Sequence, residues 1–180
     1  MTHTPKNHKC EACLRSKVKT RQCRRQKTGL GPPPKRFGEA VTTDHILAYT
    51  DDAKSLTGHL NALMFYDRGT TWIESFPTKA LGATEVFNLI NAYEAPKESM
   101  EYVYCADSAA IEKALKMHRI RYDTSTPGQP KTNGIAERQV QEVINGTRSL
   151  LSNAGLPASF WPYAMSSFIA TTDDPYAKEP

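Results

Sequence analysis

The sequence predicts an α/β domain in which a mixed sheet is flanked by helices, preceded by a basic, irregular N-terminal arm. Runs rich in β-branched and aromatic residues alternate with amphipathic segments, in the order three strands, helix, strand, helix, strand, helix. Strand runs mixed with helix crossovers are typical of a mixed sheet. The chain has 180 residues and is 39% apolar, enough for one domain with a buried core and an appendage.

The first three strands are expected close together in the sequence. Residues 37–44 carry β-branched positions that lead to an acid, so we expect a strand that ends in Asp44. Two further runs, residues 60–67 and 70–77, predict a hairpin with a short turn that Asp67 closes.

The connection from the first strand to the hairpin, residues 47–59, is long and polar, and it is predicted to be a solvent-exposed loop. It carries Asp51 and Asp52, for which metal binding is a minor alternative. After the hairpin, residues 80–95 have the period of an amphipathic helix, with a buried stripe of Val86, Phe87, Leu89, Ile90 and Tyr93.

The remaining strands alternate with helices. Residues 101–107 predict a short buried strand that ends in Asp107, and Cys105 within it is expected to be a small core residue rather than a ligand. A helix over residues 108–120 and a strand over residues 121–126 follow. Ligands of α/β sheets gather at the carboxyl ends of strands, so Asp107 is a candidate functional residue.

A loop rich in Pro, Gly and Asn, residues 126–134, leads into the last long helix. Asn-Gly at the end of this loop permits the positive φ of a tight turn. Glu137, in the first turn, borders the apolar face of the helix, where a carboxylate suggests a cationic partner; the alternative is that it only complements the helix dipole. The apolar face consists of Ala136, Val140, Val143, Ile144, Thr147 and Leu151.

Basic residues are concentrated at the N-terminus. Residues 1–36 contain eleven Lys or Arg and one acid, a net charge of +10, which leaves −6 for the rest of a chain whose total is +4. Such an arm is typical of binding to a polyanion by counterion release, so we expect a nucleic acid as partner; the alternative is a solvated tail without one. No apolar run has the length of a membrane span and no secretion signal is recognisable, so we expect an intracellular protein without membrane contacts.

A C-x-x-C pair, Cys10 and Cys13, lies within the arm. Two thiolates on one tight turn form half of a tetrahedral zinc site, and His8 is a candidate further ligand. His3 and Cys23 are also available, but none of these three residues stands at a standard spacing. An intact zinc module and a truncated remnant of one therefore both remain open.

The segment TPGQPKTNGIAER, residues 126–138, resembles the third acidic motif of integrase catalytic cores from copia-type retrotransposons and, more distantly, retroviruses. The resemblance covers roughly residues 37–170. It implies a ribonuclease H-like fold, with the catalytic core over residues 37–172 and a tail over residues 173–180. Residues 1–36 would then be a partial zinc-binding element followed by a linker.

The resemblance also implies an active site. Family cores hold two Mg²⁺ or Mn²⁺ ions with three carboxylates, and the matching positions here are Asp44, Asp107 and Glu137, with Asp44 shared by both ions. Such a site would process DNA ends and transfer them to target DNA, in the nucleus and as a homo-oligomer; RNA is an additional candidate partner. The expected nucleic-acid contacts are Arg15, Lys17, Lys19, Arg21, Arg24, Arg25, Arg138, Gln141, Asn145 and Arg148.

Two departures from the family pattern leave the activity open. Ser108 replaces the Asn that follows the second acid, and only 29 residues separate Asp107 from Glu137, fewer than is usual. Either the carboxylates still converge, or the deletion has removed the turn that aims Glu137. In the second case the chain is a catalytically dead or co-opted fragment that only binds nucleic acid. A free ribonuclease of the same fold is a weaker third alternative, because the motif at residues 133–138 is integrase-like.

Overall fold

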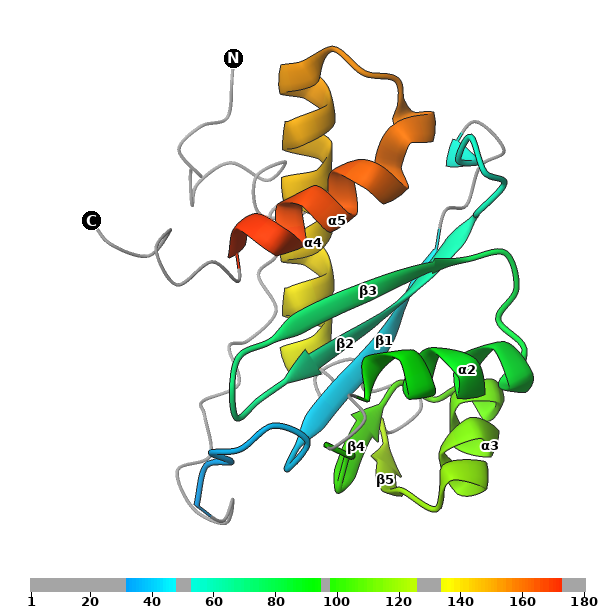
Figure 1. Ribbon diagram of the computed structural model, residues 1–180, viewed down its shortest axis with the longest axis vertical. Helices are drawn as coiled ribbons and strands as arrows, with labels where there is room; N and C mark the ends of the chain where they lie inside the picture. The colour runs from blue at the N-terminus through cyan, green and yellow to red at the C-terminus, as the bar shows by residue number, and fades with distance from the viewer. Residues whose placement is uncertain (1–31, 48–52, 95–97, 126–133, 173–180) are drawn as a thin grey trace, which may run out of the picture. The chain divides into compact units, whose positions relative to one another are not determined.

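In a computed structural model, five strands form one mixed sheet with the order β3-β2-β1-β4-β5 (Figure 1). The structure describes residues 32–47, 53–94, 98–125 and 134–172. Contacts divide the chain into two compact units, residues 1–32 and 33–180, and the description concerns the second. The strands are β1 (Val41–Leu47), β2 (Asn61–Asp67), β3 (Ile73–Thr78), β4 (Tyr102–Cys105) and β5 (Arg121–Thr124).

Helices cover both faces of the sheet, as the sequence predicted. The pairs β1–β2 and β2–β3 are antiparallel, whereas β1–β4 and β4–β5 are parallel. Two helices lie on one face and two on the other (Figure 1). The helices are α2 (Ala83–Tyr93), α3 (Ala109–His118), α4 (Gly134–Ala154) and α5 (Trp161–Thr172), with a short 3₁₀ turn, η3 (Ala158–Phe160), before α5.

Each face of the sheet has its own hydrophobic core, and alternation along the strands assigns residues to one or the other. Val41 of β1 packs into the core beneath α2 and α3, whereas Ile46 packs into the core beneath α4 and α5. Asp44 shares the parity of Ile46 and therefore faces α4. His45 shares the parity of Val41 and faces α3.

The prediction that the first strand ends in Asp44 is wrong, since β1 continues to Leu47. Its parallel pairing with β4 stops at Thr43, which lies opposite Cys105, but its antiparallel pairing with β2 extends to Leu47. The distant β2 therefore holds the additional residues in the strand. Asp44 lies where the parallel part of the sheet ends, although it is inside a strand.

Asp67 closes the β2–β3 turn, as predicted, and it also secures the chain before β1. Its side chain is fully buried. One carboxylate oxygen accepts hydrogen bonds from the backbone N–H groups of Gly69 and Thr70 and from the Thr70 hydroxyl, and the other accepts from Gly38 N–H at 2.8 Å. Gly38 has φ +77°, and its carbonyl accepts from Glu101 N–H at 2.7 Å. A buried carboxylate with these partners is fully compensated.

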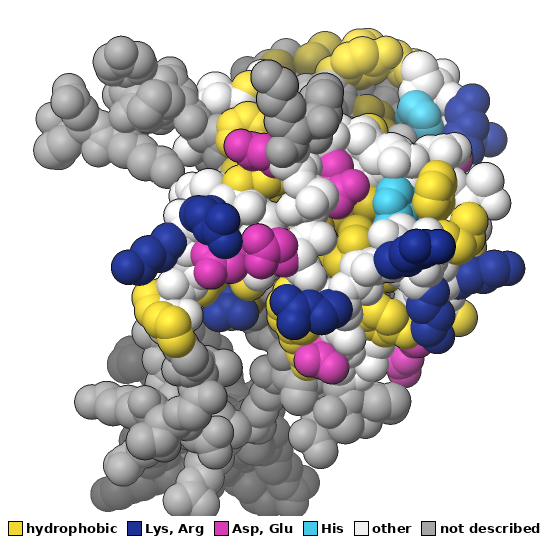
Figure 2. All heavy atoms as spheres, turned by 60° about the horizontal axis from the view of Figure 1, so that its bottom comes forward, with side chains coloured by type: hydrophobic (Ala, Val, Ile, Leu, Met, Phe, Trp, Pro, Cys, Tyr) yellow, Lys and Arg dark blue, Asp and Glu magenta, His cyan; other side chains and the backbone are white. Residues whose placement is uncertain are grey.

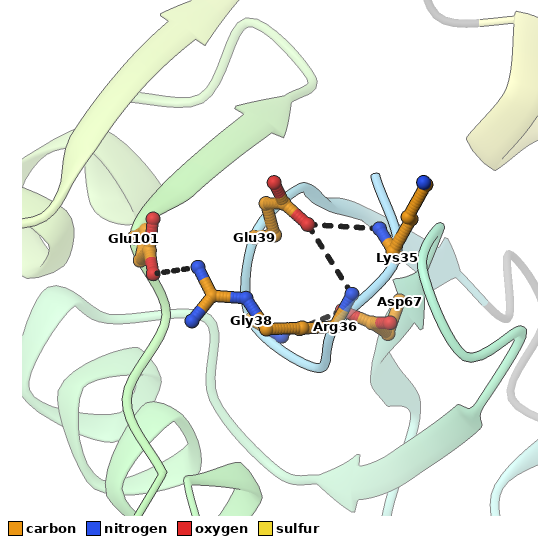
Figure 3. Close-up of polar contacts among 6 residues, drawn as sticks. All are labelled: Lys35, Arg36, Gly38, Glu39, Asp67 and Glu101. Atoms are coloured by element: carbon orange, nitrogen blue, oxygen red, sulfur yellow. Dashed lines mark hydrogen bonds and ion pairs between the residues drawn. The ribbon is translucent and has the colours of Figure 1, made fainter. Parts of the chain in front are cut away.

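The turn that precedes β1 brings charged residues to the amino end of the sheet (Figure 3). Glu39 accepts hydrogen bonds from the backbone N–H groups of Lys35 and Arg36. The Arg36 guanidinium lies 3.3 Å from the Glu101 carboxylate, next to the start of β4. Together with Asp67, which binds Gly38 N–H, side chains from three segments of the chain therefore meet where the chain enters the core.

In the predicted solvent-exposed loop over residues 47–59, Lys54, Leu56 and Thr57 are exposed as expected, but other residues of its second half make contacts that the prediction did not include. Ser55 is buried, and its hydroxyl accepts a hydrogen bond from His59 N–H. Leu56 N–H donates to the Ser159 carbonyl at 3.1 Å, and the Trp161 indole N–H donates to the Ala53 carbonyl at 2.9 Å. The polar residues of this segment satisfy one another and the start of α5, a long-range arrangement that polarity alone does not reveal.

The other elements agree with the prediction in type and differ mainly in length. The elements α2, α3, β4 and β5 are each shorter than predicted by one to a few residues at one or both ends. On α4, Ala136, Val143, Thr147 and Leu151 are buried, so the predicted face is confirmed. Among the described helices, none has both the length and the apolar character that crossing a membrane requires.

Candidate active site

The parallel strands β1 and β4 place two acidic residues at one edge of the sheet. The register pairs Thr43 with Cys105, and Ala106 N–H donates to the Thr43 carbonyl at 3.3 Å, which extends the pairing by one residue. Asp44 comes directly after Thr43, and Asp107 directly after Ala106. Both acids therefore lie at the edge where the carboxyl ends of parallel strands meet, the position at which α/β sheets bind ligands.

Asp44 lies in an environment that disfavours its ionised form. The side chain is half-buried, and burial is the main cause that raises its pKa. The negative charge of Glu137 raises this pKa further. The hydrogen bond that His45 N–H donates to Asp44 Oδ1 at 2.7 Å acts in the opposite direction. The net effect is a raised pKa.

Glu137 comes from the first turn of α4, on the face of the sheet to which Asp44 points. The neighbouring Ala136 is fully buried and packs the start of the helix against the rest of the domain. Glu137 itself is exposed, and its charge acts on Asp44. The carboxylate predicted to border the apolar face of α4 thus has another carboxylate as a neighbour.

Asp107 is exposed at the end of β4, and its backbone is held by the end of β5. Its N–H donates to the Ser125 hydroxyl at 3.1 Å, and Ser125 N–H donates to the Cys105 carbonyl at 2.9 Å. The negative charges of Asp44 and Asp107 both contribute to a raised pKa of the Cys105 thiol.

Oxygen donors of this kind suit a hard divalent cation. Asp44 and Glu137 offer only carboxylate oxygens, which Mg²⁺ and Mn²⁺ prefer. A cation between them would relieve the like-charge effect that raises the Asp44 pKa. No group of three His, Cys, Asp or Glu side chains in the described part of the chain is arranged to hold a metal ion. The donor chemistry fits a divalent ion at Asp44 and Glu137. Asp107, at the end of the adjacent strand, does not complete a three-residue metal-binding group with them.

Sequence reasoning missed the environment of His45. Its Nε2 lies 3.4 Å from the Ser108 hydroxyl, at the residue that precedes α3. Within the described ranges, its buried Nδ1 has no hydrogen-bond partner, and burial lowers the pKa of the imidazole. The contact links β1 next to Asp44 with the turn after Asp107. Strand alternation could have placed His45 on the α3 face. Its contact with Ser108, 63 residues away, could not be predicted from any local sequence pattern.

The helix surface beyond Glu137 is polar and exposed, as predicted. Arg138, Gln141, Asn145 and Arg148 are all exposed. The Gln141 amide donates to the Asn145 side chain at 3.0 Å. Arg148 lines an otherwise mainly apolar pocket of about 420 Å³, formed between the end of β1, α4 and the start of α5. Contact of this ridge with nucleic acid remains a prediction.

Several predicted site residues lie outside the described residues. They include the zinc candidates and the basic residues of the arm, the acidic pair of the first connection, and most of the loop before Glu137. These residues are Cys10, Cys13, His8, Arg15, Lys17, Lys19, Arg21, Arg24, Arg25, Asp51, Asp52 and positions 126–133.

Comparison with known sequences finds retrotransposon proteins. No protein-family model matches the chain. A stretch of 60 residues, 33% of the chain and 4% of the relative, is 38% identical to the Retrovirus-related Pol polyprotein from transposon TNT 1-94 of Nicotiana tabacum. A stretch of 110 residues, 58% of the chain and 8% of the relative, is 26% identical to the corresponding polyprotein from transposon RE1 of Arabidopsis thaliana. The chain thus spans less than a tenth of the length of these curated relatives.

Comparison with solved structures identifies the fold. The intasome of simian T-cell lymphotropic virus, solved in complex with a PP2A regulatory subunit, matches with a TM-score of 0.62 and 19% identity over 91% of this chain and 57% of that chain. The catalytic core domain of BIV integrase matches with a TM-score of 0.54 and 12% identity over 77% of this chain and 85% of that chain. The predicted ribonuclease H-like fold is confirmed, and the sequence relatives together with this fold support a retrotransposon integrase core, as predicted.

Proposed function

We propose that this retrotransposon integrase core carries out phosphoryl transfer on DNA ends, that is, end processing followed by strand transfer. The observation that carries the proposal is the effect of the Glu137 charge on half-buried Asp44, with Asp107 at the end of the adjacent strand. A neighbouring charge that raises the pKa of a half-buried acid costs stability, so this arrangement at a strand edge is typical of a functional site. The retrotransposon relatives and the integrase fold give this arrangement its chemical interpretation.

Asp44 and Glu137 would hold one divalent cation, and Asp44 and Asp107 would hold a second. Bound Mg²⁺ or Mn²⁺ would activate a water or a 3′-hydroxyl and stabilise the leaving oxygen of a phosphodiester. Asp44 is the member whose orientation the chain controls most closely, because His45 N–H donates to its Oδ1 and the strand restricts its backbone. Glu137 and Asp107 are exposed, so both are accessible to a large substrate.

The nucleic acid would be held by two groups of residues. The exposed α4 residues Arg138, Gln141, Asn145 and Arg148 would contact the backbone near the carboxylates. The basic arm would supply most of the salt-dependent affinity. In this proposal residues 1–36 are the arm with a partial zinc-binding element at Cys10 and Cys13, residues 37–172 the catalytic core and residues 173–180 a tail. The protein would act as a homo-oligomer on DNA in the nucleus.

A second function is favoured by one observation. Among the described residues, Asp107 forms no metal-binding group with Asp44 and Glu137. If the short connection before α4 prevents these three from converging, the chain is a catalytically inactive fragment that only binds nucleic acid. Both functions require DNA binding, and only the first requires turnover.

The deciding experiment is disintegration of a branched DNA substrate by the full chain in Mn²⁺, a reaction expected of integrase cores. Asp44→Asn and Glu137→Gln should each reduce cleavage to background. Glu142→Gln is the matched control, because Glu142 is an exposed acid on the same helix, and this variant should cleave like the wild type. Equal cleavage by Asp44→Asn and the wild type would refute the proposed site. DNA binding without cleavage would establish the second function.

A further inference from the structure

Basic residues of the core are clustered in one short segment away from the candidate active site. Residues 37–180 contain twelve Lys or Arg, because eleven of the 23 in the chain lie in residues 1–36. Four of the twelve, Lys113, Lys116, Arg119 and Arg121, fall within nine consecutive positions. All four are exposed. They form a basic patch on a core whose net charge is negative.

This basic patch lies at the opposite edge of the sheet from the candidate carboxylates. The helix α3 begins just after Asp107 and returns to the start of β5, so its last turn lies at the amino ends of the parallel strands. Arg121 pairs with Tyr102 at the start of β4, and the preceding residue, Glu101, forms the ion pair with Arg36. Figure 2, in which the lower side of Figure 1 comes forward, shows Lys and Arg side chains distributed across this face.

Contacts within the fold account for only part of the patch. Lys116 forms an ion pair with Glu112 at 3.6 Å and lies 5.8 Å from the centre of the Tyr122 ring. Its position in the last turn of α3 also complements the helix dipole. Within the described ranges, Lys113, Arg119 and Arg121 have no ion-pair partner. Local stability therefore explains one of the four cations.

Arg36 lies at the same edge of the domain as the basic patch. Arg36 is the last basic residue of the arm, and its guanidinium contacts Glu101 at the start of β4. The chain before Arg36 carries the other ten Lys and Arg residues of the arm. A polyanion that lay along the patch would therefore pass Arg36.

We propose that Lys113, Lys116, Arg119 and Arg121 form a second DNA-binding surface, which holds the phosphate backbone of a duplex at a distance from the active site. The proposal goes beyond the proposed function, because it requires binding and no turnover. Exposed cations without internal partners lose little on contact with phosphates, and each contact releases condensed counterions. An acidic face of a second copy is the competing occupant, since the core beyond the arm is negatively charged.

The test measures the salt dependence of duplex DNA binding by the full chain carrying Asp44→Asn, in which turnover plays no part. The patch variant carries the two substitutions Lys113→Gln and Arg121→Gln. It is compared with a control variant that carries Lys54→Gln and Lys79→Gln. The control pair is exposed and lies near Gly58, between the β1–β2 and β3–α2 connections. For the patch variant we expect the slope of log K against log salt to decrease by about 0.9 per lost phosphate contact, close to 2 in total, with the control unchanged.

Three outcomes would overturn the proposal. If the slope of log K against log salt changes equally in the patch variant and in the control, these four cations form no distinct surface. The same conclusion follows if the slope changes in neither variant. A loss of self-association in sedimentation velocity, with DNA binding unchanged, would assign the patch to contact with a second copy. Equal thermal unfolding of the variants and the parent confirms that the comparison concerns binding alone. A wild-type chain that cleaves no DNA leaves this test unaffected.

Discussion

The negative charge of Glu137 at the start of α4 acts on Asp44 in the middle of β1 and adds to the effect of burial in raising the Asp44 pKa. The two residues belong to elements far apart in the sequence, which the packing of α4 on the sheet brings together. An arrangement that makes ionisation of a half-buried acid more costly reduces stability, and this cost is the physical signature of the candidate site.

The raised pKa predicts a pH-dependent gain in stability on neutralising Asp44. Since the folded-state pKa lies above the unfolded value, the group favours folding below the unfolded-state pKa, and this contribution is lost as the pH rises through the folded-state pKa. At neutral pH, Asp44→Asn should therefore raise Tm by a few degrees. Near about pH 3 the two proteins should unfold alike, because the carboxyl is then protonated in both states. Thermal denaturation at both pH values checks this, and a lower Tm for Asp44→Asn at neutral pH would contradict it.

A divalent metal ion should reverse the order of stability of the wild type and Asp44→Asn. A cation that binds only the folded protein stabilises it in proportion to the logarithm of its concentration over Kd, by about 2.7 kcal/mol at 100 times Kd. Mn²⁺ should therefore raise Tm of the wild type and of Glu142→Gln, and much less that of Asp44→Asn or Glu137→Gln. Calorimetry with Mn²⁺ and with Ca²⁺, against a matched NaCl series, separates specific binding from ionic strength. An equal rise in all four proteins would show that the metal binds elsewhere.

The sheet and its helices could be predicted because each depends on local patterns. The period of α4 identifies its buried face, and the Asp-x-Gly-Thr sequence identifies Asp67 as the residue that closes a turn. The end of β1 could not be predicted, since residues beyond Thr43 stay in the strand only through pairing with β2. The contact of His45 with Ser108 likewise depends on tertiary packing across 63 residues.

The candidate site was only partly readable from sequence for the same reason. Asp44 and Asp107 could be placed at one edge because parallel strands share their carboxyl ends. The helix period placed Glu137 beside the apolar face of α4, but it did not indicate the direction from which Glu137 approaches the sheet. That direction depends on the packing of Ala136 and of the α4 face against the sheet, which no local pattern specifies.

Asp67 should be the most sensitive acidic residue for stability. Asp67→Ala leaves four hydrogen-bond donors from the turn and from Gly38 without their acceptor, in a position with no solvent access. Each unsatisfied buried donor costs about 1–3 kcal/mol, so we expect a loss on the order of 3 kcal/mol or more. Asp123→Ala, which removes one exposed hydrogen bond with Tyr102, should cost less than about 1 kcal/mol. Urea denaturation measures both, and similar losses would contradict the assigned role of Asp67.

The contact between α4 and α5 predicts opposite effects of the same substitution at two glycines. A Cβ at Gly146 would collide with the Phe168 ring, whereas a Cβ at Gly134 would meet nothing within 4 Å. Gly146→Ala should therefore destabilise the protein by about 1–3 kcal/mol through overpacking, although Ala is the better helix former. Gly134→Ala should be neutral or stabilising by up to about 1 kcal/mol. Equilibrium unfolding compares them, and a stable Gly146→Ala protein would mean that the two helices can separate at little cost.

Cys105 should be chemically inert in the folded protein. Burial raises the pKa of its thiol to about 12, with smaller contributions from the charges of Glu112, Asp44, Asp107 and Asp123. Because the thiolate is the reactive form, alkylation near about pH 8 should be slower by roughly three orders of magnitude than in the unfolded chain. Iodoacetamide labelling followed by peptide mass spectrometry, with a sample in urea as the control, gives both rates. Modification of Cys105 at the unfolded rate under native conditions would show that this edge of the sheet opens readily and that the carboxylates beside it are not held in place.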